Sequence, residues 1–197
     1  MQATRNSQFR GGKMKTIILV ILVLLIAIFQ AKGQTLGNLH GNVEQENQIS
    51  DGMFTPQVKS YLSYDFTKKV GAYCWLQTSK GYSQIYCGPT FSPKGFIQVG
   101  VALGAQTGKK TLRIGSFVWV GKGKFSNTFI LETSGGTWCR NLTGYKASKT
   151  FTVTLVGERY KGFGPRLDVQ IPKTKLSVGG EIFPSSRVAR FGFRYSF

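Results

Sequence analysis

From Tyr61 to the last residue, apolar positions alternate with polar or small ones at a period of two. The stretch FIQVGVALGA, residues 96–105, places Ile97, Val99 and Val101 on one face of a strand, with glutamine, glycine and alanine on the other. Successive side chains of a β-strand point to opposite faces, so this pattern predicts strands. The same alternation recurs in 151–158, 166–171 and 175–182, and no window has the 3.6-residue period of an amphipathic helix.

Short turn-like sequences separate these segments, and the spacing of about a dozen residues predicts an antiparallel meander. The separators are Lys68-Lys69, Lys80-Gly81, Ser92-Pro93-Lys94, Thr107-Gly108-Lys109, Gly121-Lys122-Gly123, Ser134-Gly135-Gly136 and Gly162. The polar stretch 34–56 shows no periodicity and is expected to be a loop-like lead-in to a β-domain over 57–197.

Alternation alone does not show which face is buried, because a soluble sandwich turns its apolar face inward and a membrane barrel turns it toward lipid. Three features favour the membrane barrel: small residues on the polar face, charges in the middle of strands, and aromatic residues near strand ends. The last group, expected to form an interfacial girdle, is Tyr61, Tyr64, Tyr73, Trp75, Tyr82, Tyr86, Trp138, Tyr145 and Tyr160. We therefore predict an all-β, antiparallel up-and-down transmembrane barrel of 8–12 strands, with ten favoured because strand numbers are usually even.

The mid-strand charges are expected to line the interior of this barrel. They are Arg113, Glu132, Glu158, Asp168, Glu181, Arg190 and Arg194. One interpretation is a lumen closed by ion pairs, since buried charge requires partners. The other is an anion-attracting path lined by Arg113, Arg190 and Arg194, which a barrel of about ten strands is wide enough to permit.

The amino-terminal segment predicts export. Basic residues precede an apolar run from Ile17 to Phe29, which is too short to span a bilayer but suits a signal peptide. Ala31 and Gly33 then precede a cleavage site, which gives a signal peptide of residues 1–33, with 1–13 a mis-assigned start if Met14 is the true one. Its removal lowers the formal net charge from +18 to +13, because it holds five basic residues and no acid.

The final octapeptide, RFGFRYSF, resembles the C-terminal assembly signal of outer-membrane β-barrel proteins. Arg190, Gly192, Tyr195 and Phe197 occupy the matching places. The stretch GPRLDVQIPKTKLSVGG, residues 164–180, is likewise similar to small outer-membrane barrels of Gram-negative bacteria. The resemblance implies an outer-membrane location, recognition by the barrel-assembly machinery and closure of the barrel by the last strand against the first.

Cys74 and Cys87 lie at equal distances from a turn centred on Lys80-Gly81, so they oppose each other across one hairpin. Opposed residues come within disulfide range, and an oxidising periplasm favours the bond over two thiols. The only histidine, His40, lies in the polar lead-in, which argues against a serine–histidine lipid-modifying enzyme. No metal or cofactor motif is found.

The strongly basic chain predicts anionic partners, and export favours lipid or lipopolysaccharide phosphates over nucleic acid. The preferred function is a non-enzymatic outer-membrane barrel, either structural or a narrow channel for small solutes or anions. The alternatives are a secreted soluble β-sandwich or barrel that binds an anionic polymer, and a lipid-modifying barrel enzyme.

Overall fold

Consecutive hairpins build the whole of the described chain. The computed structural model describes residues 38–108, 112–133 and 136–197, so the predicted signal peptide, residues 1–33, lies outside the described residues. Twelve strands occur in the described part: β1 (Leu39–Ser50), β2 (Met53–Asp65), β3 (Val70–Ser79), β4 (Tyr82–Lys94), β5 (Ile97–Gln106), β6 (Leu112–Lys122), β7 (Phe125–Thr133), β8 (Thr137–Lys146), β9 (Phe151–Glu158), β10 (Gly162–Gln170), β11 (Leu176–Phe183) and β12 (Val188–Ser196). A short 3-10 helix, η2 (Pro184–Ser186), joins the last two.

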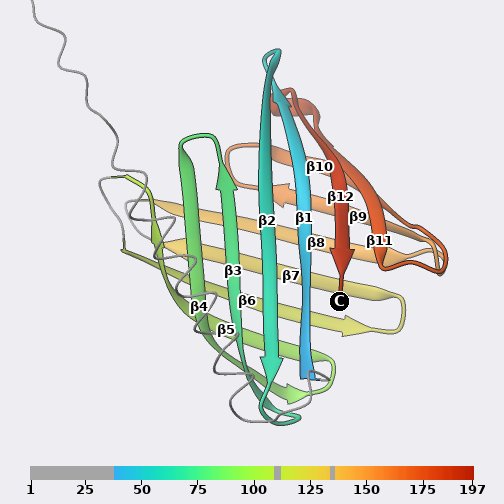
Figure 1. The fold of residues 1–197 in the computed structure, drawn as a ribbon. Helices are drawn as coiled ribbons and strands as arrows, with labels where there is room; N and C mark the ends of the chain where they lie inside the picture. The colour runs from blue at the N-terminus through green and yellow to red at the C-terminus, as the bar shows by residue number, and fades with distance from the viewer. Residues whose placement is uncertain (1–37, 109–111, 134–135) are drawn as a thin grey trace, which may run out of the picture. The chain divides into compact units, whose positions relative to one another are not determined.

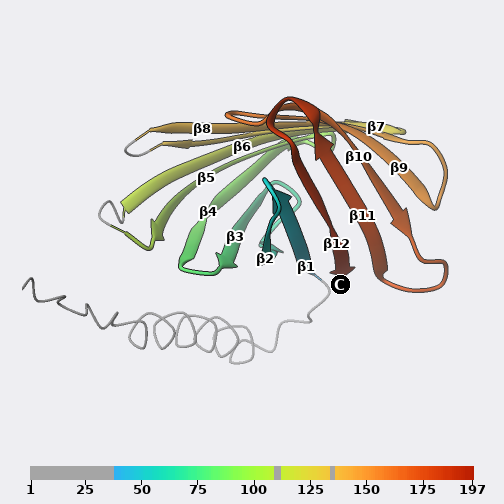
Figure 2. The ribbon, with the colours of Figure 1, turned by 90° about the horizontal axis from the view of Figure 1, so that it is seen from above.

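The strands close into a barrel in which each strand pairs antiparallel with its sequence neighbours. β12 completes the ring by pairing with β1, from Asn42 opposite Ser196 to Ser50 opposite Val188. Figure 1 shows β1 and β12 side by side, and the view from above in Figure 2 agrees. The last strand thus closes the barrel against the first, as the assembly-signal resemblance implied.

The barrel has two more strands than the favoured ten, and it begins well before residue 57. The stretch 34–56, expected to be a loop, supplies β1 and the start of β2. The outward positions 45 and 47 of β1 are the polar residues Gln45 and Asn47, so β1 lacks the apolar alternation that marks the other strands. Their side chains hydrogen-bond each other at 2.8 Å. The turn dipeptide Asp51-Gly52, with φ of 48° and 76°, is the hairpin signal that the expectation overlooked.

The apolar face of the strands points outward. Val101, Leu103 and Phe193 are 57%, 64% and 51% exposed, whereas Glu46 and Glu181 are each 2% exposed. An exposed apolar surface that extends round most strands is far larger than a soluble monomer carries. The predicted inside-out orientation is therefore confirmed. Among the described residues, no helix is long and apolar enough to cross a bilayer.

Candidate functional site: the barrel interior

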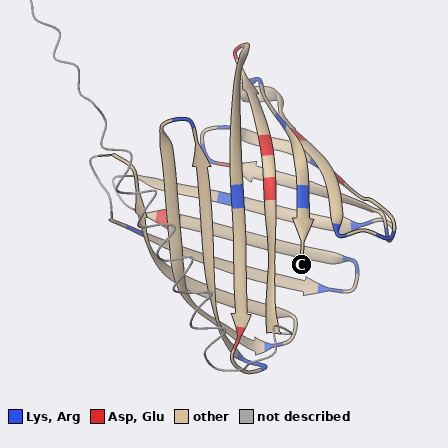
Figure 3. Ribbon diagram, in the orientation of Figure 1, with Lys and Arg blue, Asp and Glu red and all other residues tan. Residues whose placement is uncertain are grey.

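All seven charged residues predicted to face the lumen lie on the inward face of their strands. Their side chains are between 1% and 31% exposed, and each forms an ion pair with another interior residue. Figure 3 shows acidic and basic positions close together midway along β1, β2 and β12.

Most of these charges belong to one network, which we call the ionic wall. Its members are Glu44, Glu46, Lys59, Arg140, Glu158, Lys161, Arg166, Asp168, Glu181, Arg190 and Arg194, from β1, β2, β8 to β12 and the β9–β10 turn. Antiparallel pairing explains the assembly, because it places inward positions of neighbouring strands side by side, as with Glu181 and Arg190.

Two carboxylates form the centre of the ionic wall. Glu181 lies 2.6 Å from both Arg140 and Arg190. Glu158 lies 2.8 Å from Arg190, 3.3 Å from Arg140 and 2.6 Å from the Nζ of Lys161. Each carboxylate thus serves two or more cations, an arrangement that holds their side chains in fixed positions.

A second part of the ionic wall extends toward the end of the barrel where β1 begins and β12 ends, which we call the end with the termini. Arg166 binds Asp168 and Glu44 at 2.8 Å, and Glu44 also accepts from Arg194 at 3.0 Å. Lys59 of β2 lies 2.7 Å from Glu46 of β1. Glu46 also accepts a hydrogen bond from Gln57 of β2.

Glu132 and Arg113 lie apart from the ionic wall, on β7 and β6. Glu132 accepts a hydrogen bond of 2.9 Å from the hydroxyl of Tyr86, and Arg113 approaches it to 3.5 Å. Arg113 also donates to Gln84 at 3.4 Å. This smaller polar group adjoins a cluster of aromatic side chains.

Aromatic side chains form the facing part of the interior, which we call the aromatic wall: Tyr61, Tyr73, Trp75, Tyr86, Phe117 and Trp119, from β2, β3, β4 and β6. The expected interfacial girdle is wrong for most of its members, because Tyr61, Tyr73, Trp75, Tyr82, Tyr86 and Trp138 point inward and line the cavity.

Inward-facing glycines on β5 leave room for two rings of the aromatic wall, those of Phe117 and Tyr86. A side-chain carbon at Gly100 would collide with the ring of Phe117, and one at Gly104 would collide with the ring of Tyr86. These glycines therefore accommodate the large rings of the two adjacent strands, a role that Gly fills where no side chain fits.

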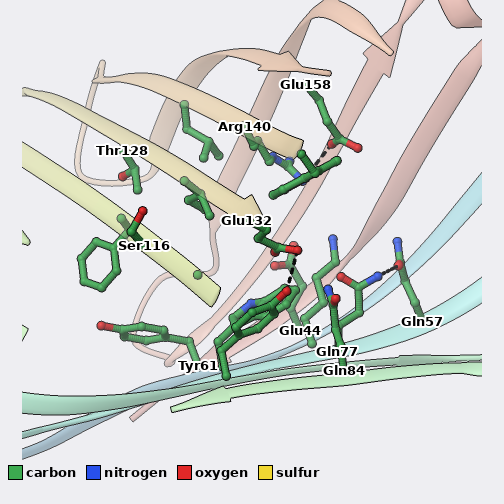
Figure 4. Close-up of a pocket in the computed structure, with 18 of the residues that line it drawn as sticks. Glu44, Gln57, Tyr61, Gln77, Gln84, Ser116, Thr128, Glu132, Arg140 and Glu158 are labelled. Atoms are coloured by element: carbon green, nitrogen blue, oxygen red, sulfur yellow. Dashed lines mark hydrogen bonds and ion pairs between the residues drawn. The ribbon is translucent and has the colours of Figure 1, made fainter. Parts of the chain in front are cut away.

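Between the two walls lies a cavity of about 940 Å³. Its lining extends from Asn42 and Gln98, near the end with the termini, to Tyr82 and Tyr160 at the opposite end. Figure 4 shows Arg140 and Glu158 on one side of this cavity, with Gln77 and Gln84 on the other. The cavity therefore follows the length of the barrel.

Cations dominate the lining. Seven cationic side chains line the cavity, namely Lys59, Arg113, Arg140, Lys161, Arg166, Arg190 and Arg194, against the three carboxylates Glu44, Glu132 and Glu158. The carboxylates Glu46, Asp168 and Glu181 pair with these cations without lining the cavity. The cavity surface therefore carries more cationic than anionic groups, although most of the charge is neutralised locally.

Sequence reasoning missed Glu44, Glu46, Lys59, Arg140, Lys161 and Arg166. A signal existed for Arg166, because it stands two residues before Asp168 and therefore on the same face. Glu44 and Glu46 show the same spacing but lay in the stretch interpreted as a loop. Arg140 stands two residues after Trp138 and therefore shares its inward face of β8.

Cys74 and Cys87 pair across the β3–β4 hairpin, with Cα atoms 4.2 Å apart, and form a disulfide. Cys139 is a free thiol. His40 lies within β1, not in a loop, and its Nε2 is 3.8 Å from Asp65 at an exposed position. The nearby Ser63 hydroxyl donates to the backbone oxygen of His40 rather than to its ring. In the described segments, no group of three potential metal ligands could hold an ion.

Exposed lysines in the described turns are distributed unevenly between the two ends. The end with the termini carries nine exposed lysines: Lys68, Lys69, Lys94, Lys122, Lys124, Lys146, Lys149, Lys173 and Lys175. Two contact aromatic rings at the edge of the apolar belt, Lys94 at Phe96 and Lys124 at Tyr145. Lys80 lies in a turn at the opposite end, and Lys109 and Lys110 lie outside the described residues.

No protein-family model matches the sequence, and no curated protein matches it significantly. Solved structures match the fold. The KdgM porin shares 13% identity, with a TM-score of 0.57 over 79% of this chain and 99% of its own. A KdgM porin in complex with disordered oligogalacturonate shares 14% identity, with a TM-score of 0.59 over 79% of this chain and 99% of its own. A NanC porin shares 11% identity, with a TM-score of 0.50 over 80% of this chain and all of its own. The chain is thus similar in fold to small porins.

Proposed function

We propose that the protein is an integral outer-membrane channel that passes small solutes and prefers anions. One observation carries this proposal: a 940 Å³ cavity follows the length of a barrel whose outer face is apolar. An apolar outer band and a polar interior are the properties of outer-membrane barrels. The similarity in fold to porins supports the same function.

The preference for anions rests on the lining. Cationic side chains outnumber carboxylates at the cavity surface, and rings of arginine and lysine favour anions in pores. One of the similar porins was solved with oligogalacturonate, whose sugar units carry carboxylates. That ligand belongs to the other protein, but it agrees with the charge of this cavity.

The export route is part of the proposal. Residues 1–33 serve as the signal peptide, and the octapeptide ending at Phe197 serves as the signal for barrel assembly. The pairing of Phe197 with Gly41, through hydrogen bonds of 3.0 and 3.3 Å between their backbones, supports the second role. An unpaired strand end in lipid would leave costly unsatisfied backbone groups.

Catalysis is not part of the proposed function. His40 does not line the cavity, and its ring is not paired with the hydroxyl of Ser63. A serine nucleophile needs a base within hydrogen-bond reach. A His40→Ala variant is therefore expected to leave conductance and lipid composition unchanged, and lost lipid turnover in that variant would instead support an enzyme.

Planar-bilayer recording tests the channel. In a salt gradient, the mature protein is expected to conduct with a reversal potential that indicates anion preference. Arg113→Gln and Arg194→Gln each remove a lining cation, so both should shift the reversal potential toward that of a non-selective pore. Lys80→Gln, at an exposed turn, is the matched control. A correctly inserted barrel without current would show that the walls close the lumen. A reversal potential without anion preference would contradict the proposed selectivity, and selectivity unchanged in both variants would show that these arginines do not produce it.

A further inference from the structure

The cavity has two chemically different walls, and we infer that together they form a binding site for a small aromatic carboxylate. This inference rests on the proposed function, because it names the class of solute that a channel of this shape would hold. The ligand combines a flat ring, which the aromatic wall accepts, with a carboxylate, which the cationic lining accepts.

The aromatic wall supplies ring contacts. Tyr73 and Phe117 meet edge to face with centroids 4.9 Å apart, and Tyr61 lies 6.2 Å from Tyr73. Tyr73 is buried within the cluster, whereas Tyr61, Trp75 and Phe117 are half-buried and line the cavity. Aromatic pairs prefer such offset and edge-to-face contacts, so the available ring surfaces suit another planar ring.

In the described part of the barrel, the cationic side chains of the interior outnumber its carboxylates, and two of their buried N–H groups lack an acceptor. Among the described residues, seven lining cations face six interior carboxylates. The buried Nε atoms of Arg140 and Arg194 have no hydrogen-bond partner there. A carboxylate that enters the cavity supplies two acceptor oxygens, which guanidinium groups bind well.

The two walls meet at β2, which carries Lys59 of the ionic wall and Tyr61 of the aromatic wall next to β1. Asn42 of β1 pairs with Tyr61 on one side and with Ser196 on the other, and the next inward position, Glu44, pairs with Arg194. Tyr61 and Arg194 therefore flank the same strand. The Arg194 side chain is 31% exposed and has one ion-pair contact, to Glu44, so it is the most accessible arginine of the lining.

A simple inorganic anion would use only the charges, and a neutral aromatic compound would use only the rings. A sugar acid carries the carboxylate but lacks the flat π-face. Four probes separate these cases: benzoate, cyclohexanecarboxylate with the same charge but no aromatic ring, benzamide with the ring but no charge, and galacturonate.

Intrinsic fluorescence gives a direct reading, because all three tryptophans of the chain, Trp75, Trp119 and Trp138, line the cavity. Titration of the detergent-solubilised mature protein needs no conduction. Benzoate is expected to give a saturable change and to bind about 10-fold more tightly than each of the other three probes. Equal affinity for cyclohexanecarboxylate, tighter binding of galacturonate, or no saturable change with benzoate would each overturn the inference.

Variants locate the site. Tyr61→Leu should weaken benzoate binding by about 3- to 10-fold, as expected for the loss of one aromatic contact. Arg194→Gln should abolish the preference for benzoate over benzamide. Phe129→Leu removes a ring from the outward face and is the matched control. An equal loss in the control would contradict the placement of the site.

The two proposals fail separately. A barrel that conducts but does not bind benzoate would contradict only this inference. A barrel that binds benzoate but carries no current would contradict only the channel.

Discussion

Glu181 shows how individual residues hold the interior together. Its Oε1 lies 2.6 Å from Arg190, and its Oε2 lies 2.6 Å from Arg140 and 3.5 Å from Arg166. Its side chain is only 1% exposed. A buried charge is tolerated only when it is well paired, and removal of one partner leaves the others uncompensated. Three arginines from three strands contact this one carboxylate.

We therefore predict that Glu181→Gln, which keeps the shape and removes the charge, lowers the free energy of unfolding by about 3–5 kcal/mol. Urea unfolding of the protein inserted in lipid vesicles measures this quantity. Asp51→Asn makes the same chemical change at an exposed turn and should have little effect. Equal stability of the Glu181 variant and the wild-type protein would show that the ionic wall does not hold the barrel.

Residues could be assigned to the interior from the sequence only where a strand was already recognised. Glu181 and Arg190 were found because apolar neighbours at alternate positions revealed their faces. Which charges pair could not be predicted, because Arg140 and Glu181 belong to strands that are distant in the sequence. Barrel closure alone brings them together.

At the scale of elements, hairpins with apolar outer positions were predictable, and β1 was not. Its outward positions include Gln45 and Asn47, which satisfy each other by hydrogen bonds. The aromatic residues show the second limit. A tyrosine near a strand end suits an interfacial girdle as well as an interior, and the choice depends on glycines such as Gly104 on another strand.

The β3–β4 hairpin provides a test of register. Cys74 faces Cys87 and is bonded to it, which leaves Cys139 as the free thiol. We predict that alkylation of the denatured, unreduced mature protein adds one label by intact mass, and that reduction raises the number to three. Cys139→Ser should then show no label without reduction. Three labels before reduction would refute the disulfide.

At the scale of the whole molecule, the account depends on orientation. Apolar side chains such as Val101 and Phe191 face outward, 57% and 47% exposed, while the mid-strand charges and all three tryptophans face the interior. A barrel of twelve strands is wide enough to leave a cavity, whereas the interior of an eight-stranded barrel is filled by side chains. The sequence predicted the direction of the faces but not the width, because width follows from the strand number.

Quenching of tryptophan fluorescence by bromine-labelled acyl chains tests this orientation most directly. Trp75, Trp119 and Trp138 line the cavity, so the protein in vesicles should be quenched only weakly. The matched control replaces them (Trp75→Phe, Trp119→Phe and Trp138→Phe) and adds Leu103→Trp on the outward face, which should be quenched strongly. Strong quenching of the native tryptophans together with weak quenching of the control would contradict the account.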